Sequence, residues 1–315
     1  MRAPPPGGEG IAMAIRGRGR WGRPDISVVV ATYGREKILC ETLTHLLDQD
    51  HPNYELIVVD QTPVHEPGTE EFLRSQDHRL RHLRLVSASL PNARNVGIRA
   101  ACGDLVLFID DDVLPARSLV SAHTTSHLSD RVAGVGGQVL SPTRETVDAS
   151  ATGRLDRATR VTWNFNSTVS GDTMYATGCN MSFRRDLLIR AGLFEVAFGG
   201  NAECEEVDLC LRLRRLGYTI RFVPAASLVH LEQVVGGCGN RRRDSRWFYW
   251  HVHNHLLLAL RHPTLFSPVA TIHARVHSVM RELRDPSLIA PLALAVARAP
   301  LTHARARASL RSTPP

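Results

Sequence analysis

The chain has 315 residues, of which 43% are apolar and 22% are charged. A chain of this length and composition can bury a sizeable core, as one large domain or two small ones. These values exclude a disordered, collagen-like or coiled-coil protein. The six cysteines form no C-x-x-C pair, so we expect reduced thiols rather than a disulfide framework or a zinc knuckle.

The apolar segments are too short for a membrane span or a secretory signal. The longest, residues 288–297, contains Pro291 and reaches about half of the ~20 residues that a spanning helix needs. Near the N-terminus, the apolar run 11–15 is shorter than the ~7–15-residue core of a signal peptide. We therefore expect a cytosolic location.

The net charge of +7 is concentrated at the two ends of the chain. Residues 1–24 carry +4 and residues 270–315 carry +5, which leaves −2 for residues 25–269. The body of the fold is therefore not expected to bind nucleic acid. Residues 1–24 are rich in Pro, Gly and Arg and are predicted to form a flexible basic tail.

Apolar runs and apolar stripes alternate from residue 25 onward. Runs typical of buried strands lie at 26–31, 54–60, 83–86, 104–109, 132–140 and 218–223. Helices are predicted by the apolar stripe at 39–47, at 91–102, at 205–216 and over most of 240–315. This alternation predicts an α/β fold with a mostly parallel central sheet, helices on both faces and a helical C-terminal extension.

Polar clusters follow three of the predicted strands. They are Thr32-Tyr33, Asp60-Gln61-Thr62 and Asp110-Asp111-Asp112. In parallel sheets, ligands bind beyond the carboxyl ends of the strands, where the loops gather. The sequence therefore predicts that the three clusters form one site.

The acidic triplet Asp110-Asp111-Asp112 is the most informative of these clusters. Crowded carboxylates repel one another, and a bound divalent cation compensates their charge. A hard cation held by one or two carboxylates completes its shell with substrate phosphates, so a diphosphate ligand is predicted. The alternative is a solvated turn or a helix N-cap before Leu114.

From about residue 26 to about residue 262, the chain resembles the family 2 glycosyltransferases, whose fold is called GT-A. The resemblance rests on four ordered stretches, 27–35, 57–60, 92–112 and 205–230, the third of which ends in the DxD pattern Asp110-Asp111-Asp112. It implies inverting transfer of a sugar from a nucleoside-diphosphate sugar to an acceptor hydroxyl, with Mg²⁺ or Mn²⁺ as cofactor. The acceptor would be a saccharide, a lipid-linked molecule or a small molecule. Residues 25–239 would form the GT-A domain and residues 240–315 the helical extension.

The resemblance also implies roles for individual residues. Donor-binding residues would be Thr32, Tyr33, Arg35, Asp60, Arg94, Asp110 and Asp111. Metal ligands would be Asp110, Asp112 and His230. The residues by themselves leave other interpretations open, with Arg94 on a helix surface, Asp60 in a turn and His230 as a structural histidine. After Asp60, the family usually has Asp-Gly-Ser, whereas Gln61-Thr62-Pro63 follows here.

Two glutamates open the predicted helix 205–216. A sugar hydroxyl must lose its proton as it attacks, so a positioned carboxylate base is needed. The family generally has Glu-Asp here, and the resemblance implies Glu206 as the base with Glu205 as the second candidate. The alternative is that both residues only favour the helix dipole. Acceptor contacts are expected from Trp163, Asn180 and Asp208, with core packing as the alternative for Trp163.

Three alternating histidines occur in the predicted C-terminal helices. Only His251 and His255 would share a helix face, at spacing i, i+4. Because the sequence shows no convergent carboxylate beside them, a metal site is not expected there.

Two other functions stay open from the sequence. Nucleotidyl transfer to a sugar phosphate uses a similar sheet and metal, but a Gly-rich, Lys-containing loop would be expected where Thr32-Tyr33-Gly34-Arg35 stands. A non-enzymatic protein would bind RNA or anionic lipid through the basic ends. For the transferase, nucleic acid is not expected as a partner. Its C-terminal extension is a candidate for peripheral membrane contact, with a packed helix and a solvated tail as the alternative.

Overall fold

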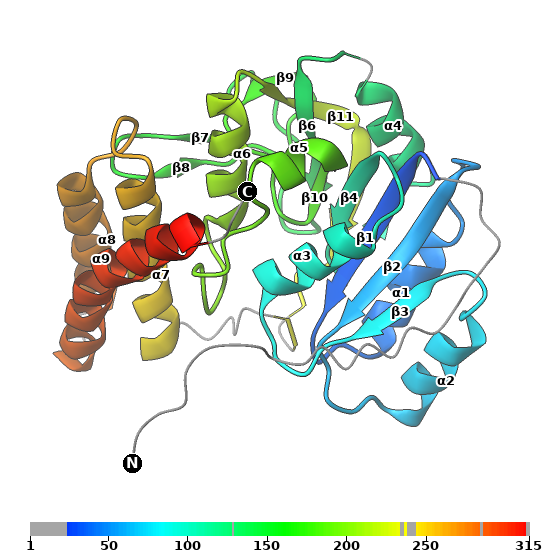
Figure 1. The fold of residues 1–315 in the computed structure, drawn as a ribbon, viewed down its shortest axis with the longest axis horizontal. Helices are drawn as coiled ribbons and strands as arrows, with labels where there is room; N and C mark the ends of the chain where they lie inside the picture. Colours follow the sequence, from blue (N-terminus) through cyan, green and yellow to red (C-terminus); the bar gives the residue numbers. More distant parts are fainter. Residues whose placement is uncertain (1–23, 128, 234–235, 238–243, 284–285, 313–315) are drawn as a thin grey trace.

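The computed structural model describes residues 24–127, 129–233, 236–237, 244–283 and 286–312. The predicted basic tail, except Pro24, lies outside the described residues. Within them, nine strands form one sheet in the order β3-β2-β1-β4-β10-β6-β11-β5, with β9 paired to β11 (Figure 1). The strands of this sheet are β1 (Ile26–Thr32), β2 (Tyr54–Asp60), β3 (Arg81–Arg84), β4 (Leu105–Ile109), β5 (Val113–Pro115), β6 (Val132–Leu140), β9 (Gly171–Thr173), β10 (Asn180–Arg184) and β11 (Thr219–His230). A separate two-stranded ribbon joins β7 (Arg154–Leu155) to β8 (Val161–Thr162).

Helices cover both faces of the sheet (Figure 1). They are α1 (Lys37–Leu46), α2 (Pro67–Ser75), α3 (Leu90–Ala100), α4 (Leu119–Ser126), α5 (Arg185–Arg190), α6 (Glu205–Arg215), α7 (Ser245–Arg261), α8 (Pro268–Leu283) and α9 (Ile289–Ser312), with a 3₁₀ turn at Pro286–Leu288. Among the described residues, no helix is both long and apolar enough to cross a bilayer.

The sheet is mostly parallel because crossover helices join its first strands. β1 pairs in parallel with β2 and β4, β2 with β3, and β6 with β11, whereas β10, β5 and β9 run antiparallel to their neighbours. These pairings confirm the predicted fold class. The helix N-cap considered after the acidic triplet is not formed, because residues 113–115 form β5 instead.

One apolar core lies on the two faces of the sheet and includes part of the C-terminal helices. Leu257 and Leu258 of α7, together with Phe266, belong to the same buried cluster as the strands. A second, smaller cluster joins α7 to α9 through Phe248, Val252 and Leu292. The first C-terminal helix is therefore packed against the body of the fold.

Candidate active site

The registers of the parallel strands bring the three predicted polar clusters to one edge. Thr32 is paired with Asp60 across β1 and β2, and Val30 is paired with Ile109 across β1 and β4. Thr32 and Asp111 each lie two residues beyond the Val30–Ile109 pair and are therefore neighbours. The Thr32 hydroxyl donates to Asp111 Oδ2 at 2.6 Å. The predicted single site is thus formed by adjacent strand ends.

The acidic triplet is only partly neutralised, with Asp111 and Asp112 buried and Asp110 partly exposed. Arg35 lies 3.5 Å from Asp111 Oδ1 and 3.1 Å from Asp112 Oδ2, and the backbone N–H of Gln233 also donates to Asp112 Oδ2 at 3.1 Å. Burial raises the pKa of Asp111 to about 7, and the carboxylates of Asp112 and Asp110 add to this rise while Thr32 and Arg35 oppose it. The negative charges therefore crowd one another, as the sequence indicates.

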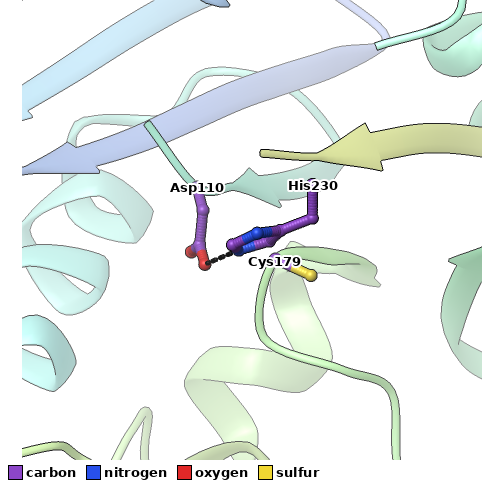
Figure 2. Close-up of side chains that lie close together, drawn as sticks. All are labelled: Asp110, Cys179 and His230. Atoms are coloured by element: carbon purple, nitrogen blue, oxygen red, sulfur yellow. Dashed lines mark ion pairs between the residues drawn. The ribbon is translucent and has the colours of Figure 1, made fainter. Parts of the chain in front are cut away.

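Three side chains from separate segments converge at the mouth of this cluster, namely Asp110, Cys179 and His230 (Figure 2). Their donor atoms all lie within 4.8 Å of one another, and His230 Nε2 is 3.7 Å from Asp110 Oδ2. His230 Nε2 is also 3.5 Å from Asp112 Oδ1. The predicted ligands Asp110, Asp112 and His230 are therefore brought together.

Cys179 was not expected in this group. Antiparallel pairing sets Asn180 of β10 opposite Ile109 of β4, so the preceding residue, Cys179, falls beside Asp110. Nothing in the spacing of the sequence shows that pairing, which joins residues some 70 positions apart. Burial raises the pKa of the Cys179 thiol well above its ordinary value, so the sulfur stays protonated.

The chemistry of these residues fits a divalent cation. The carboxylates of Asp110 and Asp112 offer the hard oxygen donors that Mg²⁺ and Mn²⁺ prefer, and His230 adds an imidazole nitrogen. Burial works against ionisation of Asp110, but His230, Arg94 and Arg35 together hold its pKa below the ordinary value. Asp110 is thus ionised, and the triplet has three carboxyl groups beside the two arginines Arg35 and Arg94.

Asp60 lies behind this edge rather than on its open surface. Its carboxylate is fully buried and contacts His65 Nε2 and His82 Nε2, each at 2.9 Å, and accepts the backbone N–H of Thr62 at 2.8 Å. Burial opposes ionisation of Asp60, but these bonds outweigh it and hold its pKa well below the ordinary value. Gln61, the residue after it, lines the open pocket instead.

Two adjoining pockets open on either side of the triplet. The first, the triplet pocket, has a volume of about 230 Å³ and is lined by residues that include Thr32, Tyr33, Arg35, Gln61 and the three aspartates. The second, the glutamate pocket, has a volume of about 340 Å³ and is lined by residues that include Arg94, Trp163, Glu203, Glu205 and Glu206. Leu90, Asp110, Asn201 and His230 line both pockets, so the two share one wall.

The two glutamates of α6 have different surroundings. Glu205 is 1% exposed and forms a close ion pair with Arg94, whose guanidinium also lies 3.4 Å from Asp110. Glu206 is half-buried and lines the glutamate pocket. Burial raises the pKa of Glu206 to about 7; the carboxylates of Glu203 and Asp110 contribute to this rise, and Arg94 opposes it. Glu206 is therefore the glutamate suited to accept a proton.

Of the three predicted acceptor residues, only Trp163 faces the pocket. Its ring lies under the guanidinium of Arg144, with 4.9 Å between the ring centroid and Arg144 Cζ, and both side chains line the glutamate pocket. Asn180 is fully buried, and its amide nitrogen donates to the carbonyls of Gln138 and Ala226. Sequence reasoning missed Arg144 because it lies in a loop with no recognisable pattern.

Asp208 is also withdrawn from the pocket. It is fully buried and forms ion pairs with Arg212 at 2.9 Å and with Arg261 of α7 at 2.6 Å, and its Oδ1 lies 2.8 Å from His262 Nε2. Burial opposes its ionisation, but Arg212, His262 and Arg261 outweigh burial and hold the pKa of Asp208 far below its ordinary value. Asp208 therefore links α6 to α7 through these ion pairs, in a contact that we call the joint between the two helices.

A family comparison identifies the family of the chain. The profile of the family described as Glycosyl transferase family 2 matches residues 27–192, just over half of the chain. The chain belongs to this family. It is 26% identical to a chondroitin synthase from Escherichia coli over an alignment of 244 positions that covers 66% of this chain and 34% of the synthase. Matches to this and other curated relatives cover between 15% and 34% of those proteins' own lengths.

Solved structures establish the fold of this family member. The mannosyltransferase PcManGT from Pyrobaculum calidifontis, in complex with GDP-Man and Mn²⁺, aligns with a TM-score of 0.53 and 20% identity over 96% of this chain and 82% of that chain. GalNAc-T7 with UDP, GalNAc and Mn²⁺ aligns with a TM-score of 0.57 and 14% identity over 82% of this chain and 57% of that chain. Both are GT-A glycosyltransferases, so the predicted GT-A fold is confirmed.

Proposed function

We propose that the chain is a metal-dependent, inverting glycosyltransferase that moves a sugar from a nucleoside-diphosphate sugar to an acceptor hydroxyl. The observation that carries this proposal is that the triplet pocket and the glutamate pocket share one wall. The acidic triplet lines the first pocket, and Glu206, a carboxylate whose pKa is raised to about 7, lines the second. A donor and an acceptor would meet at that wall.

The triplet pocket is the proposed donor site. Tyr33 is partly exposed there and offers an aromatic face, while Thr32, Arg35 and Gln61 line the same pocket. Asp110, Asp112 and His230 would hold Mg²⁺ or Mn²⁺, and a bound cation supplies charge neutralisation on the departing diphosphate. Asp60 would act from behind, by fixing the loop of Gln61 and Thr62.

Glu206 is the proposed general base. The acceptor oxygen forms a bond to the anomeric carbon while the bond from that carbon to the diphosphate oxygen breaks, and the hydroxyl proton passes to the Glu206 carboxylate. Direct attack from the face opposite the leaving group inverts the anomeric centre. Arg94 pairs with both Asp110 and Glu205, so it would hold the start of α6, which carries Glu206, in place beside the metal ligands. Trp163 would stack on an acceptor sugar.

A thermal-shift panel tests this proposal. The intact chain would be heated with uridine, guanosine, cytidine and adenosine diphosphates and with their sugars, each with and without Mn²⁺. We expect one nucleotide to raise the melting temperature only when Mn²⁺ is present, because the metal links the diphosphate to the triplet. Stabilisation by RNA, with none from any nucleotide, would contradict it and favour the basic-binding alternative. The predictions of a cytosolic location and of membrane contact through the C-terminal helices stay predictions.

A further inference from the structure

A second group of metal-ligating side chains lies between the body of the fold and α7. It consists of Glu203, in the loop before α6, and of His251 and His255, one turn apart on α7. Their donor atoms lie within 4.8 Å of one another. The two histidines were predicted to share a helix face, and the structure supplies the carboxylate that the sequence did not show.

The distances in this group suit a small divalent ion. Glu203 Oε2 is 2.7 Å from His251 Nδ1 and 3.9 Å from His255 Nε2. Donor atoms that surround a tetrahedral ion at bond lengths of about 2.0–2.2 Å lie roughly 3.3–3.5 Å apart. The two observed separations lie on either side of that value, so a small movement of one carboxylate satisfies both.

Two polar neighbours surround Nδ1 of His255. It lies 3.1 Å from the Thr159 hydroxyl, which itself donates to the carbonyl of Ala158 at 2.7 Å, and 3.5 Å from Cys204 Sγ. In the tautomer that donates its Nδ1–H to Thr159, Nε2 carries a lone pair and faces the oxygen of Glu203. A cation between these two acceptors would compensate their charge.

The surrounding side chains hold the group as metal-site partners do. The bond to Thr159 orients the ring of His255, which is 4% exposed. The ring of Trp247 stacks on His251 with 4.8 Å between centroids and 13° between planes. Hydrogen bonds to the outer nitrogen of a ligating histidine are a regular feature of metal sites, because they set its tautomer and orientation.

We propose that Glu203, His251 and His255 form a second metal site, for a borderline divalent ion of the Zn²⁺ class. Two imidazoles and one carboxylate match the ligand preference of that class, in contrast to the oxygen-rich triplet. The bound ion would tie α7 to the loop that precedes Glu206. Because Glu203 also lines the glutamate pocket, the ion would stiffen one wall of the active site.

Cobalt spectroscopy on the full chain tests this site. Co²⁺ would be added to metal-free protein carrying Asp110→Asn, which weakens binding at the triplet, and visible absorption would report low-coordinate Co²⁺. We expect one equivalent to bind, and Zn²⁺ to displace it. Adding His251→Gln should weaken this binding by at least about tenfold, since changes even in outer-shell partners cost that much.

A matched control uses the other histidine pair at spacing i, i+4. His273 and His277 of α8 stack at 5.5 Å but, within the part of the chain that the structure describes, belong to no such group, so His273→Gln should leave Co²⁺ binding unchanged. Glu203→Gln provides a second variant of nearly equal volume, with circular dichroism as the check on folding. Absence of a bound equivalent, or unchanged affinity in folded His251→Gln and Glu203→Gln, would overturn the site. The readout is metal binding, so it stands apart from any transfer activity.

Discussion

Adjacent residues of like chemistry take different roles at the start of α6. Glu205 is ion-paired with Arg94 inside the protein, whereas Glu206 faces the glutamate pocket. The sequence pattern pointed to both residues and to the first turn of a helix, but it could not show which carboxylate would be neutralised. That depends on Arg94, which lies more than a hundred positions earlier in the chain.

The protonation state of Glu206 predicts a pH-dependent rate. A base must be ionised, and burial raises the pKa of Glu206 to about 7. The rate of transfer at low substrate should therefore rise about tenfold per pH unit below 7 and level off above it. The charged groups that set this value are Glu203, Asp110 and Arg94. Initial rates between pH 5 and 9 measure the profile, and a rate that is flat from pH 5 to 7 would exclude Glu206 as the base.

Asp110 is predicted to be needed for metal-linked nucleotide binding. Asp110→Asn removes a charge that lies beside His230 and on the shared wall, so affinity for nucleotide with Mn²⁺ should fall by at least about tenfold. Calorimetric titration measures it. Asp104→Asn is the matched control, because Asp104 lies just before the opposite end of β4 and is exposed. Equal affinity in the two variants would contradict the role of Asp110.

At the scale of elements, short apolar runs predicted six strands of the sheet, but not β5, β9 or β10 and not all of the strand ends. β6 agrees with its predicted bounds, whereas β11 continues past the predicted end at Val223 to His230. Pro224, directly after the predicted end, lacks an N–H for the ladder. The structure accommodates Pro224 with a register shift between Val223 and Ser227. This continuation carries His230 to the acidic triplet.

The joint between α6 and α7 is predicted to stabilise the fold through Asp208. Asp208→Asn removes the charge partner of Arg212 and one of the two charge partners of Arg261, which keeps Glu195, and should lower the free energy of unfolding by about 3–5 kcal/mol. Urea denaturation measures the change. Asp48→Asn is the control, because Asp48 is 77% exposed and its ion pair with Arg117 is long, at 3.7 Å. It should change stability by less than about 0.5 kcal/mol.

The loss of stability in Asp208→Asn is expected to depend on pH. The pKa of Asp208 is lowered in the folded chain, so its stabilisation is fully present above the ordinary carboxyl pKa near 4 and is lost as pH falls below it. The difference in unfolding free energy between the native chain and Asp208→Asn should therefore be largest at neutral pH and shrink below about pH 4. A difference that grows with acidity would contradict the assigned network.

At the scale of the whole molecule, the sequence predicted the layers of the fold but not how distant segments meet. Cys179 beside Asp110, and Glu203 beside His251, follow from pairings across tens of residues that local periodicity does not encode. The division into a domain at 25–239 and an extension at 240–315 stays a prediction. Leu257, Leu258 and Phe266 nevertheless share the core of the sheet.

This shared core predicts that the C-terminal helices are required for folding. A chain ending at Gly237 loses at least these three large buried side chains of the sheet core, each worth about 1.5–3 kcal/mol of apolar burial, and exposes the surfaces they cover. Since the whole stability of a domain is about 5–15 kcal/mol, we expect little folded protein. Circular dichroism and a cooperative melting transition are the measurements, with a chain ending at Ser312 as the control. A cooperative transition in the shorter chain would show an independent domain.

In the proposed function, nucleotide binds in the triplet pocket and Glu206 removes the proton in the adjoining glutamate pocket. Glu206→Gln tests it most directly, with nucleotide affinity and transfer rate measured on the same preparation in Mn²⁺. The exposed Glu71→Gln in α2 is the matched control. We expect unchanged nucleotide affinity in both variants and a rate lowered about 10²–10⁴-fold only in Glu206→Gln. Transfer by Glu206→Gln at the rate of the native chain would contradict it.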